Sequence, residues 1–228
     1  MKIALCFSGQ PRFIEKMNFD YLMSKHQVDV YAHFWWCDDY KGETFAWNSN
    51  LTYPEDYNPI EMFNNKMNPK ILHFEKYPSF DLSKFKMRSQ MEFSLEPDVV
   101  EKSIYRQKSQ WTSVKKSLEL VNGDYDLVIR ARTDLVFNDI VPLEFCNEDA
   151  VYFMDGSLQA GKGREYCDWF YCGSKTQMLA FDPLKIYDEF YENGIRHMHE
   201  LVLFTLQELK IPHYVMDLKT YMLDRSKL

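Results

Sequence analysis

The stretch YDLVIRARTDLVF at residues 125–137 decides the fold that the sequence predicts. Its content of Val, Ile and Leu, directly after a Gly-Asp turn, is typical of a buried strand in a parallel sheet. Because side chains alternate along a strand, Arg130, Arg132 and Asp134 are expected on one face, near the carboxyl end. Ligands of open α/β sheets bind beyond the carboxyl ends of strands, so these charges indicate a site for a charged ligand. The alternative is a buried Arg–Asp pair that only orders the sheet.

The rest of the chain alternates apolar runs of strand length with segments of helical periodicity. Strands are expected at residues 2–7, 28–36, 69–77, 150–156 and 168–173, with a last strand or an extended tail at 213–223. Helices are expected at residues 11–25, 97–123, 175–192 and 196–210, and a long polar loop at 37–58. This order predicts the α/β class, as a single domain over residues 1–228 with a mainly parallel central sheet flanked by helices.

Composition narrows the possible partners and the location. The 228 residues are 46% hydrophobic, which is enough for a full core, and the net charge of −7 argues against non-specific nucleic-acid binding. The five cysteines show no CxxC spacing, so neither a disulfide framework nor a zinc site is expected. No apolar stretch approaches the ~18 residues of a membrane span, and the first apolar run is too short for a signal peptide. We therefore expect a cytoplasmic protein with no membrane span.

A second candidate segment, SGQPR, follows the first expected strand. Ser8, Gly9 and Gln10 place small or polar groups at the carboxyl end of that strand. Arg12 would stand at the start of the helix expected from residue 11, where an anion also meets backbone N–H groups. The alternative is that the segment forms only a turn and a helix cap. The dinucleotide motif GxGxxG and the phosphate-binding motif GxxxxGK[ST] are both absent from the sequence.

Other polar residues are weaker candidates. His33, Asp38 and Asp39 invite a metal site, but their spacing matches no strong template, and acids in a loop are more often solvated. On the long helix expected at 97–123, three polar residues are candidates to face a ligand, although a solvated helix face is the more common arrangement: Gln110, Ser113 and Lys116.

Three segments in order, KIALCFSGQPR, DVYAHFWW and SQWTSVKKSLELVNGDYDLVIRARTDLVF, resemble small glycosyltransferase-like proteins of the GT-A type from bacterial surface-polysaccharide loci and large DNA viruses. The resemblance implies a nucleotide-sugar-binding half at residues 1–137 and an acceptor-side half at 138–228. It implies transfer of a sugar from a nucleotide-sugar donor to a carbohydrate acceptor. For a viral member of the family, the location would be the host cytoplasm.

The resemblance also assigns roles to residues. In the family's DxD motif two acids usually hold a divalent metal against the donor diphosphate; here Asp134 matches the second acid, and Arg132 stands in place of the first. Asp134 is therefore the expected ligand of Mn²⁺ or Mg²⁺, or else the arginines replace the charge of the metal. The expected donor-binding residues are Ser8, Gly9, Gln10, Arg12, Arg130, Arg132 and Asp134.

On the acceptor side, Asp168 beside two aromatic residues is the expected catalytic base, and Glu200 is the second candidate. Lys162 and Arg164, in a glycine-rich segment, are candidates to meet phosphate. Two rival functions remain open: a non-catalytic nucleotide- or carbohydrate-binding module on the same fold, and a phosphate-ester hydrolase or nucleotidyltransferase. The last would need several clustered acids.

Overall fold

The protein is described from a computed structural model. The residues whose placement it describes are 1–43, 52–83, 85, 97–137, 143, 146, 149–154, 166, 168–192, 198–216 and 220–222.

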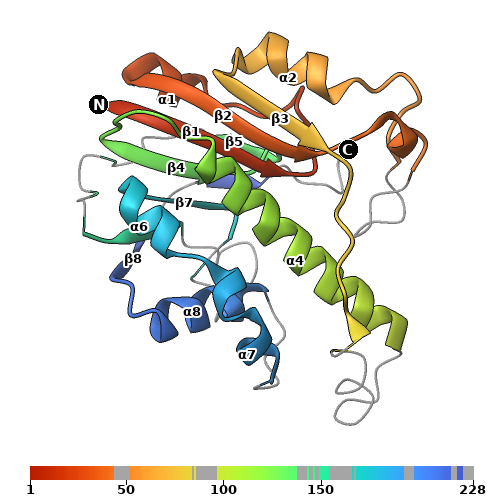
Figure 1. Ribbon diagram of the computed structural model, residues 1–228. Coiled ribbons are helices and arrows are strands. Elements are labelled where there is room, and N and C mark those ends of the chain that lie inside the picture. The colour runs from red at the N-terminus through yellow and green to blue at the C-terminus, as the bar shows by residue number, and fades with distance from the viewer. Residues whose placement is uncertain are drawn as a thin grey trace.

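A seven-stranded sheet forms the centre of the molecule, in the order β3-β2-β1-β4-β7-β6-β8 (Figure 1). Its strands are β1 (Lys2–Gly9), β2 (Gln27–Trp35), β3 (Ile71–Glu75), β4 (Leu127–Ala131), β6 (Val151–Met154), β7 (Phe170–Gly173) and β8 (His213–Met216). All pairings are parallel except those of β7 with β4 and β6, so six of the seven strands run in one direction. The prediction of a mainly parallel α/β sheet is confirmed.

The alternation of side chains divides the core into two layers. Ile3, Leu5 and Phe7 of β1 face one layer, which is covered by α1 (Asp20–Lys25) and α2 (Pro59–Met67). Ala4 and Cys6 face the other layer, beneath the long helix α4 (Pro97–Glu119). Figure 1 shows α4 running along this face together with the later helices. These are α6 (Lys175–Ala180), η3 (Pro183–Lys185), α7 (Tyr187–Glu192) and α8 (Met198–Glu208).

The order of the strands places a topological switch between β1 and β4. From β1 the chain proceeds to β2 and then β3 on one side, and it returns through α4 to β4 on the other side of β1. Connections that leave toward opposite edges open a crevice at the carboxyl ends of the two central strands. A ligand of this sheet is therefore expected where β1 and β4 end.

Two expected elements are shorter than the sequence indicates. The helix expected at 11–25 is limited to Asp20–Lys25, because Phe13 has a φ of +54° and the N–H of Asn18 donates to the carbonyl of Leu135 instead of bonding within a helix. The strand expected at 125–137 ends at Ala131. Beyond a turn, the chain continues as β5 (Leu135–Phe137), which pairs with β9 (Thr220–Met222) in a separate two-stranded sheet.

Three helical features also differ from those expected from the sequence. The helix α2 was not expected from the sequence; Asn58 caps its start by accepting from the N–H of Glu61, and Pro59 occupies its first turn. The helix α4 ends at Glu119, one turn before the Gly123 that was expected to close it. A short 3₁₀ helix, η1 (Asp38–Tyr40), lies in the segment expected to be a loop.

Of the two described glycines in the central sheet, Gly9 and Gly173, Gly173 has the less room for a side chain. It pairs with Val128 on one side and Val151 on the other, and a Cβ there would lie 2.8 Å from the carbonyl oxygen of Ala150. Gly173→Ala should lower the free energy of unfolding by ~1–3 kcal/mol, because backbone must shift to admit the methyl group. Urea unfolding measures this change.

The matched control is Leu179→Ala, since Leu179 is 40% exposed. That change should stay within ~0.5 kcal/mol of the parent chain, as for most exposed positions. Equal unfolding midpoints for Gly173→Ala and the parent chain would contradict the packing of β7 between β4 and β6.

Candidate functional site

A pocket rich in arginine lies where β1 and β4 end. Of the described residues, the end of β1 and the segment after it, the end of β4 and the turn after it, and one residue of α4 line it: Ser8, Gln10, Arg12, Gln110, Arg130, Arg132, Thr133 and Asp134. Six of these eight residues were predicted from the sequence to bind a donor. The structure thus brings together the two candidate segments, which lie more than 100 residues apart in the sequence. We call this the arginine pocket.

The turn after β4 arranges Arg132 and Asp134. Arg132 donates from Nε to Oδ1 of Asp134 at 2.8 Å and from Nη2 to Oδ2 at 2.6 Å. Arg12 approaches the same carboxylate, with Nη2 at 3.7 Å from Oδ2. Asp134 is 1% exposed, so one buried carboxylate is shared between two guanidinium groups. These residues follow the strand instead of continuing it, and this corrects the expected alternation beyond Ala131.

Arg130 forms the floor of the arginine pocket within β4. Its side chain is almost fully buried, and Nε donates to Oγ of Ser8 at 3.1 Å. Across the antiparallel pair, its guanidinium carbon lies 5.8 Å from the ring centroid of Tyr171, which allows a cation–π contact. Burial raises the pKa of the Tyr171 phenol, and its hydroxyl has no hydrogen-bond partner within the described part of the chain.

The segment after β1 is fixed by its backbone. Gly9 has a φ of +102°, which favours glycine, and its N–H donates to Oγ of Ser113 at 2.8 Å. The N–H of Arg12 lies near the carbonyl of Gln10 and near Oγ1 of Thr133, at 3.0 and 3.2 Å. The expectation that Arg12 begins a helix is therefore wrong, and the arginine pocket presents guanidinium groups instead of the N–H groups of a helix end.

The arginine pocket is small as it stands. Its cavity measures about 30 Å³, and ~10–15 Å³ is needed for each water molecule, so about two waters fit. Among its described lining residues, three carry a guanidinium and one carries a carboxylate. The pocket therefore combines an excess of positive charge with one buried carboxylate that Arg132 already pairs.

The donor set around Asp134 does not fit a divalent cation in this arrangement. Both carboxylate oxygens accept hydrogen bonds from Arg132, and Arg12 lies close to one of them. A cation at Asp134 would have to displace Arg132 and then lie beside two guanidinium groups, which repel it. In the described part of the chain, no group of three or more His, Cys, Asp and Glu side chains is placed to hold a metal.

A polar chain, buried at Ser113 and His33 and partly exposed at Glu75 and Lys116, supports the end of β1. Ser113 of α4 lies 2.9 Å from Nδ1 of His33, and Nε2 of His33 lies 3.0 Å from Oε1 of Glu75. Glu75 also accepts from Lys116, which holds its pKa below the usual range. Burial lowers the pKa of His33, so the imidazole is neutral near pH 7. Of the three weaker candidates on the long helix, Ser113 and Lys116 belong to this polar chain of hydrogen bonds. Gln110 instead lines the arginine pocket.

The loop acids near His33 pair separately. Asp38 contacts Lys41 at 3.1 Å, and Asp39 contacts Lys76 at 2.5 Å. His33 points instead into the polar chain beneath α4. The structure therefore does not bring these three predicted metal candidates together.

Asp168 lies beside the arginine pocket but does not line it. It is 3% exposed and accepts a hydrogen bond from Gln110, which does line the pocket. Glu200 lies at the exposed start of α8 and is also not among the described lining residues. Lys162 and Arg164 lie outside the described residues. Thr133, which lines the pocket, and Tyr171, which lies beside Arg130, were missed, because the sequence places them in strands and only the turn and the sheet register give them these positions.

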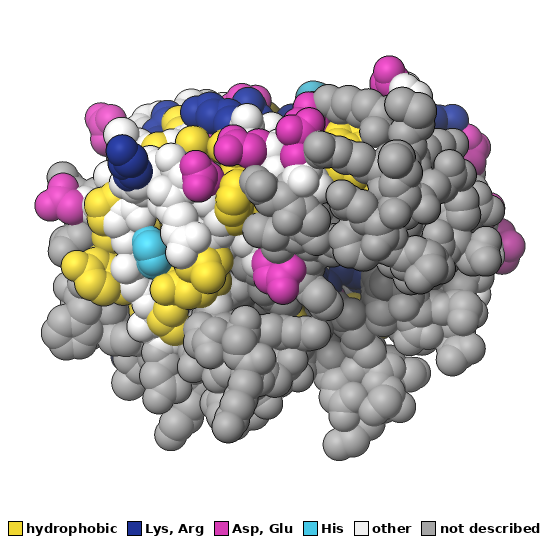
Figure 2. Space-filling view, turned by 90° about the horizontal axis from the view of Figure 1, so that it is seen from below, with side chains coloured by type: hydrophobic (Ala, Val, Ile, Leu, Met, Phe, Trp, Pro, Cys, Tyr) yellow, Lys and Arg dark blue, Asp and Glu magenta, His cyan; other side chains and the backbone are white. Residues whose placement is uncertain are grey.

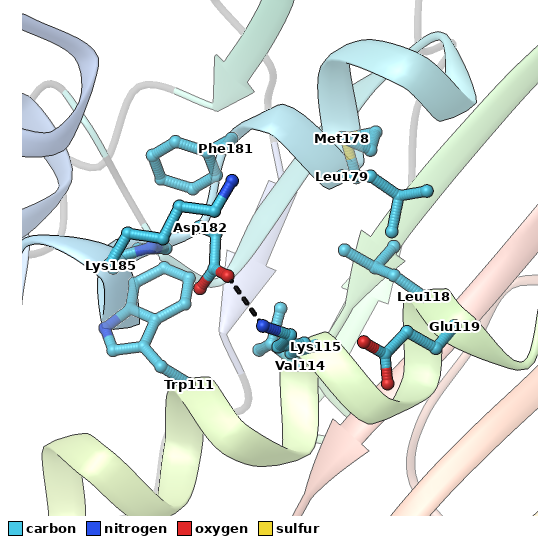
Figure 3. A pocket seen from close by; sticks show the side chains of 11 residues that line it. Trp111, Val114, Lys115, Leu118, Glu119, Met178, Leu179, Phe181, Asp182 and Lys185 are labelled. Atoms are coloured by element: carbon cyan, nitrogen blue, oxygen red, sulfur yellow. Dashed lines mark hydrogen bonds and ion pairs between the residues drawn. The ribbon is translucent and has the colours of Figure 1, made fainter. Parts of the chain in front are cut away.

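A larger groove of about 280 Å³ lies elsewhere, between α4 and the segment from α6 to η3 (Figure 3). Trp111, Leu118, Met178 and Phe181 give it apolar walls. Figure 3 shows Lys115 pointing toward Asp182, and their charged atoms lie 2.9 Å apart. The groove contains none of the residues predicted from the sequence for the donor, so its size alone does not make it the site.

On the described part of the face that Figure 2 shows, no broad field of a single charge is seen. Acidic and basic side chains are interspersed over the described part of that face (Figure 2). The clustering of guanidinium groups in the arginine pocket is thus a local feature. Within the described chain, no helix has the length and apolar character that crossing a membrane requires.

Comparisons with known proteins find similarity in structure. No family model matches the chain, and no curated protein matches its sequence. Among solved structures, it is similar to the apo form of the glycosyltransferase GlyE of Streptococcus pneumoniae TIGR4, with 12% sequence identity and a TM-score of 0.48. The match covers 94% of this chain and 45% of that chain, so this chain spans less than half the length of GlyE.

The buried His33 makes stability depend on pH. Its pKa is lowered from 6.5 in the folded chain, mainly by burial, so the unfolded chain binds a proton more readily. The free energy of unfolding should therefore fall as pH drops below 6.5, and should be fully restored above it. Urea unfolding between pH 5 and 7.5 measures the slope.

Two variants distinguish the contribution of His33 to this pH dependence from the contributions of other titrating groups. His33→Gln should flatten the slope in this range, whereas His26→Gln, outside the polar chain, should keep it. Glu75 titrates below this range because Lys116 lowers its pKa from 4.5. An unchanged slope in His33→Gln would show that the imidazole does not carry the effect.

Proposed function

We propose that this protein is a glycosyltransferase whose arginine pocket binds the diphosphate of a nucleotide-sugar donor. One observation carries the proposal: three guanidinium groups converge at the carboxyl ends of β1 and β4, where the strand order reverses. Ligands of open α/β sheets bind at this point, and planar guanidinium groups match phosphate oxygens in pairs. The resemblance of the sequence to GT-A-type proteins supports the same assignment.

In the proposed mechanism Arg132 changes partner on donor binding. Asp134 holds its guanidinium beside the pocket in the absence of donor, and the diphosphate oxygens would then take over those hydrogen bonds. Arg12 would remain near Asp134, so the buried carboxylate keeps a positive neighbour. The guanidinium groups would stabilise the negative charge that grows on the leaving diphosphate as the sugar departs. This arrangement favours an enzyme that needs no divalent metal.

Asp168 is the proposed general base toward a carbohydrate acceptor. Gln110 orients its carboxylate at the edge of the arginine pocket, and Tyr171 lies within electrostatic range of both Asp168 and Arg130. A positioned carboxylate accepts the proton of the acceptor hydroxyl as that oxygen attacks the sugar. Glu200 stays the second candidate for this role.

The rival functions predict different behaviour from the same pocket. A non-catalytic module would bind the nucleotide sugar and never break its glycosidic bond to phosphate. A hydrolase or nucleotidyltransferase of the two-metal kind needs clustered acids, which the described residues do not supply. Cytoplasmic location remains part of the proposal.

The first test concerns donor binding. The double variant Arg132→Met/Asp134→Asn removes the ion pair as a unit, so no carboxylate is left buried without its guanidinium. Its affinity for UDP or GDP, whichever the parent chain binds, should fall by at least ~10-fold, as expected when a charge-assisted hydrogen bond is lost. Isothermal titration measures the affinity, with Arg106→Met as the control for the lost positive charge.

The same titration decides the role of metal. With an arginine-only site, affinity in EDTA should equal affinity in Mn²⁺ for the parent chain. Affinity that appears only with Mn²⁺ and disappears in Asp134→Asn would instead establish Asp134 as a metal ligand. Equal affinity of the double variant and the parent chain would refute donor binding in the arginine pocket.

The second test concerns catalysis. Asp168→Asn should lower sugar transfer by ~10²–10⁴-fold, the usual contribution of a positioned base, while donor affinity stays within about threefold. A transfer assay beside the binding titration separates the two effects. Glu200→Gln is the matched control and should keep transfer near the parent rate.

Full transfer by Asp168→Asn would remove it as the base, and loss of transfer in Glu200→Gln would move the role there. Loss of donor affinity in Asp168→Asn would place this residue in the donor site. Donor binding without any transfer or hydrolysis by the parent chain would favour the non-catalytic module.

A further inference from the structure

Three sulfur atoms from distant parts of the sequence meet behind β7. Sγ of Cys146 lies 3.6 Å from Sγ of Cys172 and 3.8 Å from Sδ of Met216. Both cysteines are thiols in the structure, and 26 residues of sequence separate them. A disulfide bond measures ~2.05 Å, so the two sulfurs need to approach by only ~1.5 Å to bond.

The two thiols differ in position and exposure. Cys172 lies inside β7, paired with Ile129 of β4 on one side and Tyr152 of β6 on the other, and it is fully buried. Cys146 lies outside the strands and is partly exposed. Cys146 is therefore the more exposed of the two thiols, whereas the hydrogen-bonded neighbours of β7 hold Cys172 in the sheet.

The remaining described cysteines do not share this arrangement. Cys6 is buried in the layer under α4, on the opposite side of the sheet from Cys146 and Cys172. Cys37 follows β2, and the strands β1 and β4 lie between β2 and β7 in the sheet. Cys167 lies outside the described residues, so the variant Cys167→Ser serves as its control.

We propose that Cys146 and Cys172 form a redox modification site, at which a peroxide converts two adjacent thiols into an intramolecular disulfide. The peroxide transfers one oxygen to the thiol of Cys146, giving a sulfenic acid and one water or alcohol. The thiol of Cys172 then attacks that sulfur, its proton leaves with the hydroxyl as water, and the S–S bond forms. Two thiols are oxidised by two electrons, and one peroxide bond is reduced.

The disulfide would connect the segment before β6 to the strand that borders the candidate site. β7 carries Tyr171 opposite Arg130, and Asp168 lies just before it. Oxidation would thus attach Cys146 covalently to β7, on the face of the sheet opposite Tyr171 and Arg130. The inference itself rests only on the sulfur geometry, so it stands or falls independently of the proposed function.

Hydrogen peroxide treatment of the full chain tests the site. After denaturation, alkylation should find three reactive thiols where the reduced chain of five cysteines has five, with a mass loss of ~2 Da that dithiothreitol reverses. Chymotryptic mapping should recover Cys146 linked to Cys172, because cleavage at the aromatic residues 169–171 separates Cys172 from Cys167.

Matched serine variants supply the controls. Cys167→Ser should still lose two thiols, whereas Cys146→Ser and Cys172→Ser should each lose none to an intramolecular bond. Loss of two thiols in Cys146→Ser, or a linkage of Cys167 to either residue, would overturn the assignment. A stable gain of oxygen at Cys146 or Met216 with no crosslink would overturn it equally.

Discussion

The candidate site depends on one constraint: guanidinium groups are gathered in a buried place where their mutual repulsion must be balanced. Asp134 supplies one carboxylate to two of them, and Arg130 lies against a hydroxyl and an aromatic ring. Gathering like charges in a low dielectric is costly. An anionic ligand at this position would offset that cost, and this is the physical reason for proposing a phosphate-binding role for the pocket.

Two features of the surrounding fold hold the arginine pocket in place: the order of the strands and the hydrogen bonds made by α4. The reversal of strand order brings the ends of β1 and β4 together, so residues far apart in sequence share one pocket. On the side of α4, Ser113 fixes the backbone of Gly9 and is itself joined through His33 to Glu75. The polar chain therefore connects three strands and a helix beneath the segment that presents Ser8 and Gln10. A neutral His33 suits this place, because a buried positive charge would add to the repulsion nearby.

Much of this could be predicted from the sequence, and the failures have a common cause. Apolar runs and their order were sufficient for the sheet, and alternation correctly placed residues 127–131. The strand end was misplaced because the turn depends on Thr133 meeting the N–H of Arg12, a contact across 121 positions. The helix expected at 11–25 failed for the same reason, since that backbone bonds to distant partners. The pattern of residues in a short segment indicates which secondary structure that segment prefers. It does not indicate hydrogen bonds to residues that are distant in the sequence.

The most direct measurement is a crystal structure of the chain with the nucleoside diphosphate that it binds most tightly. We predict that the diphosphate lies at the ends of β1 and β4, with Arg132 turned from Asp134 to the phosphate oxygens. Arg130 should remain against Ser8, since it forms the floor. A nucleotide bound in the groove beside Trp111 and Lys115, or at the opposite edge of the sheet, with the Arg132–Asp134 pair unchanged, would contradict it.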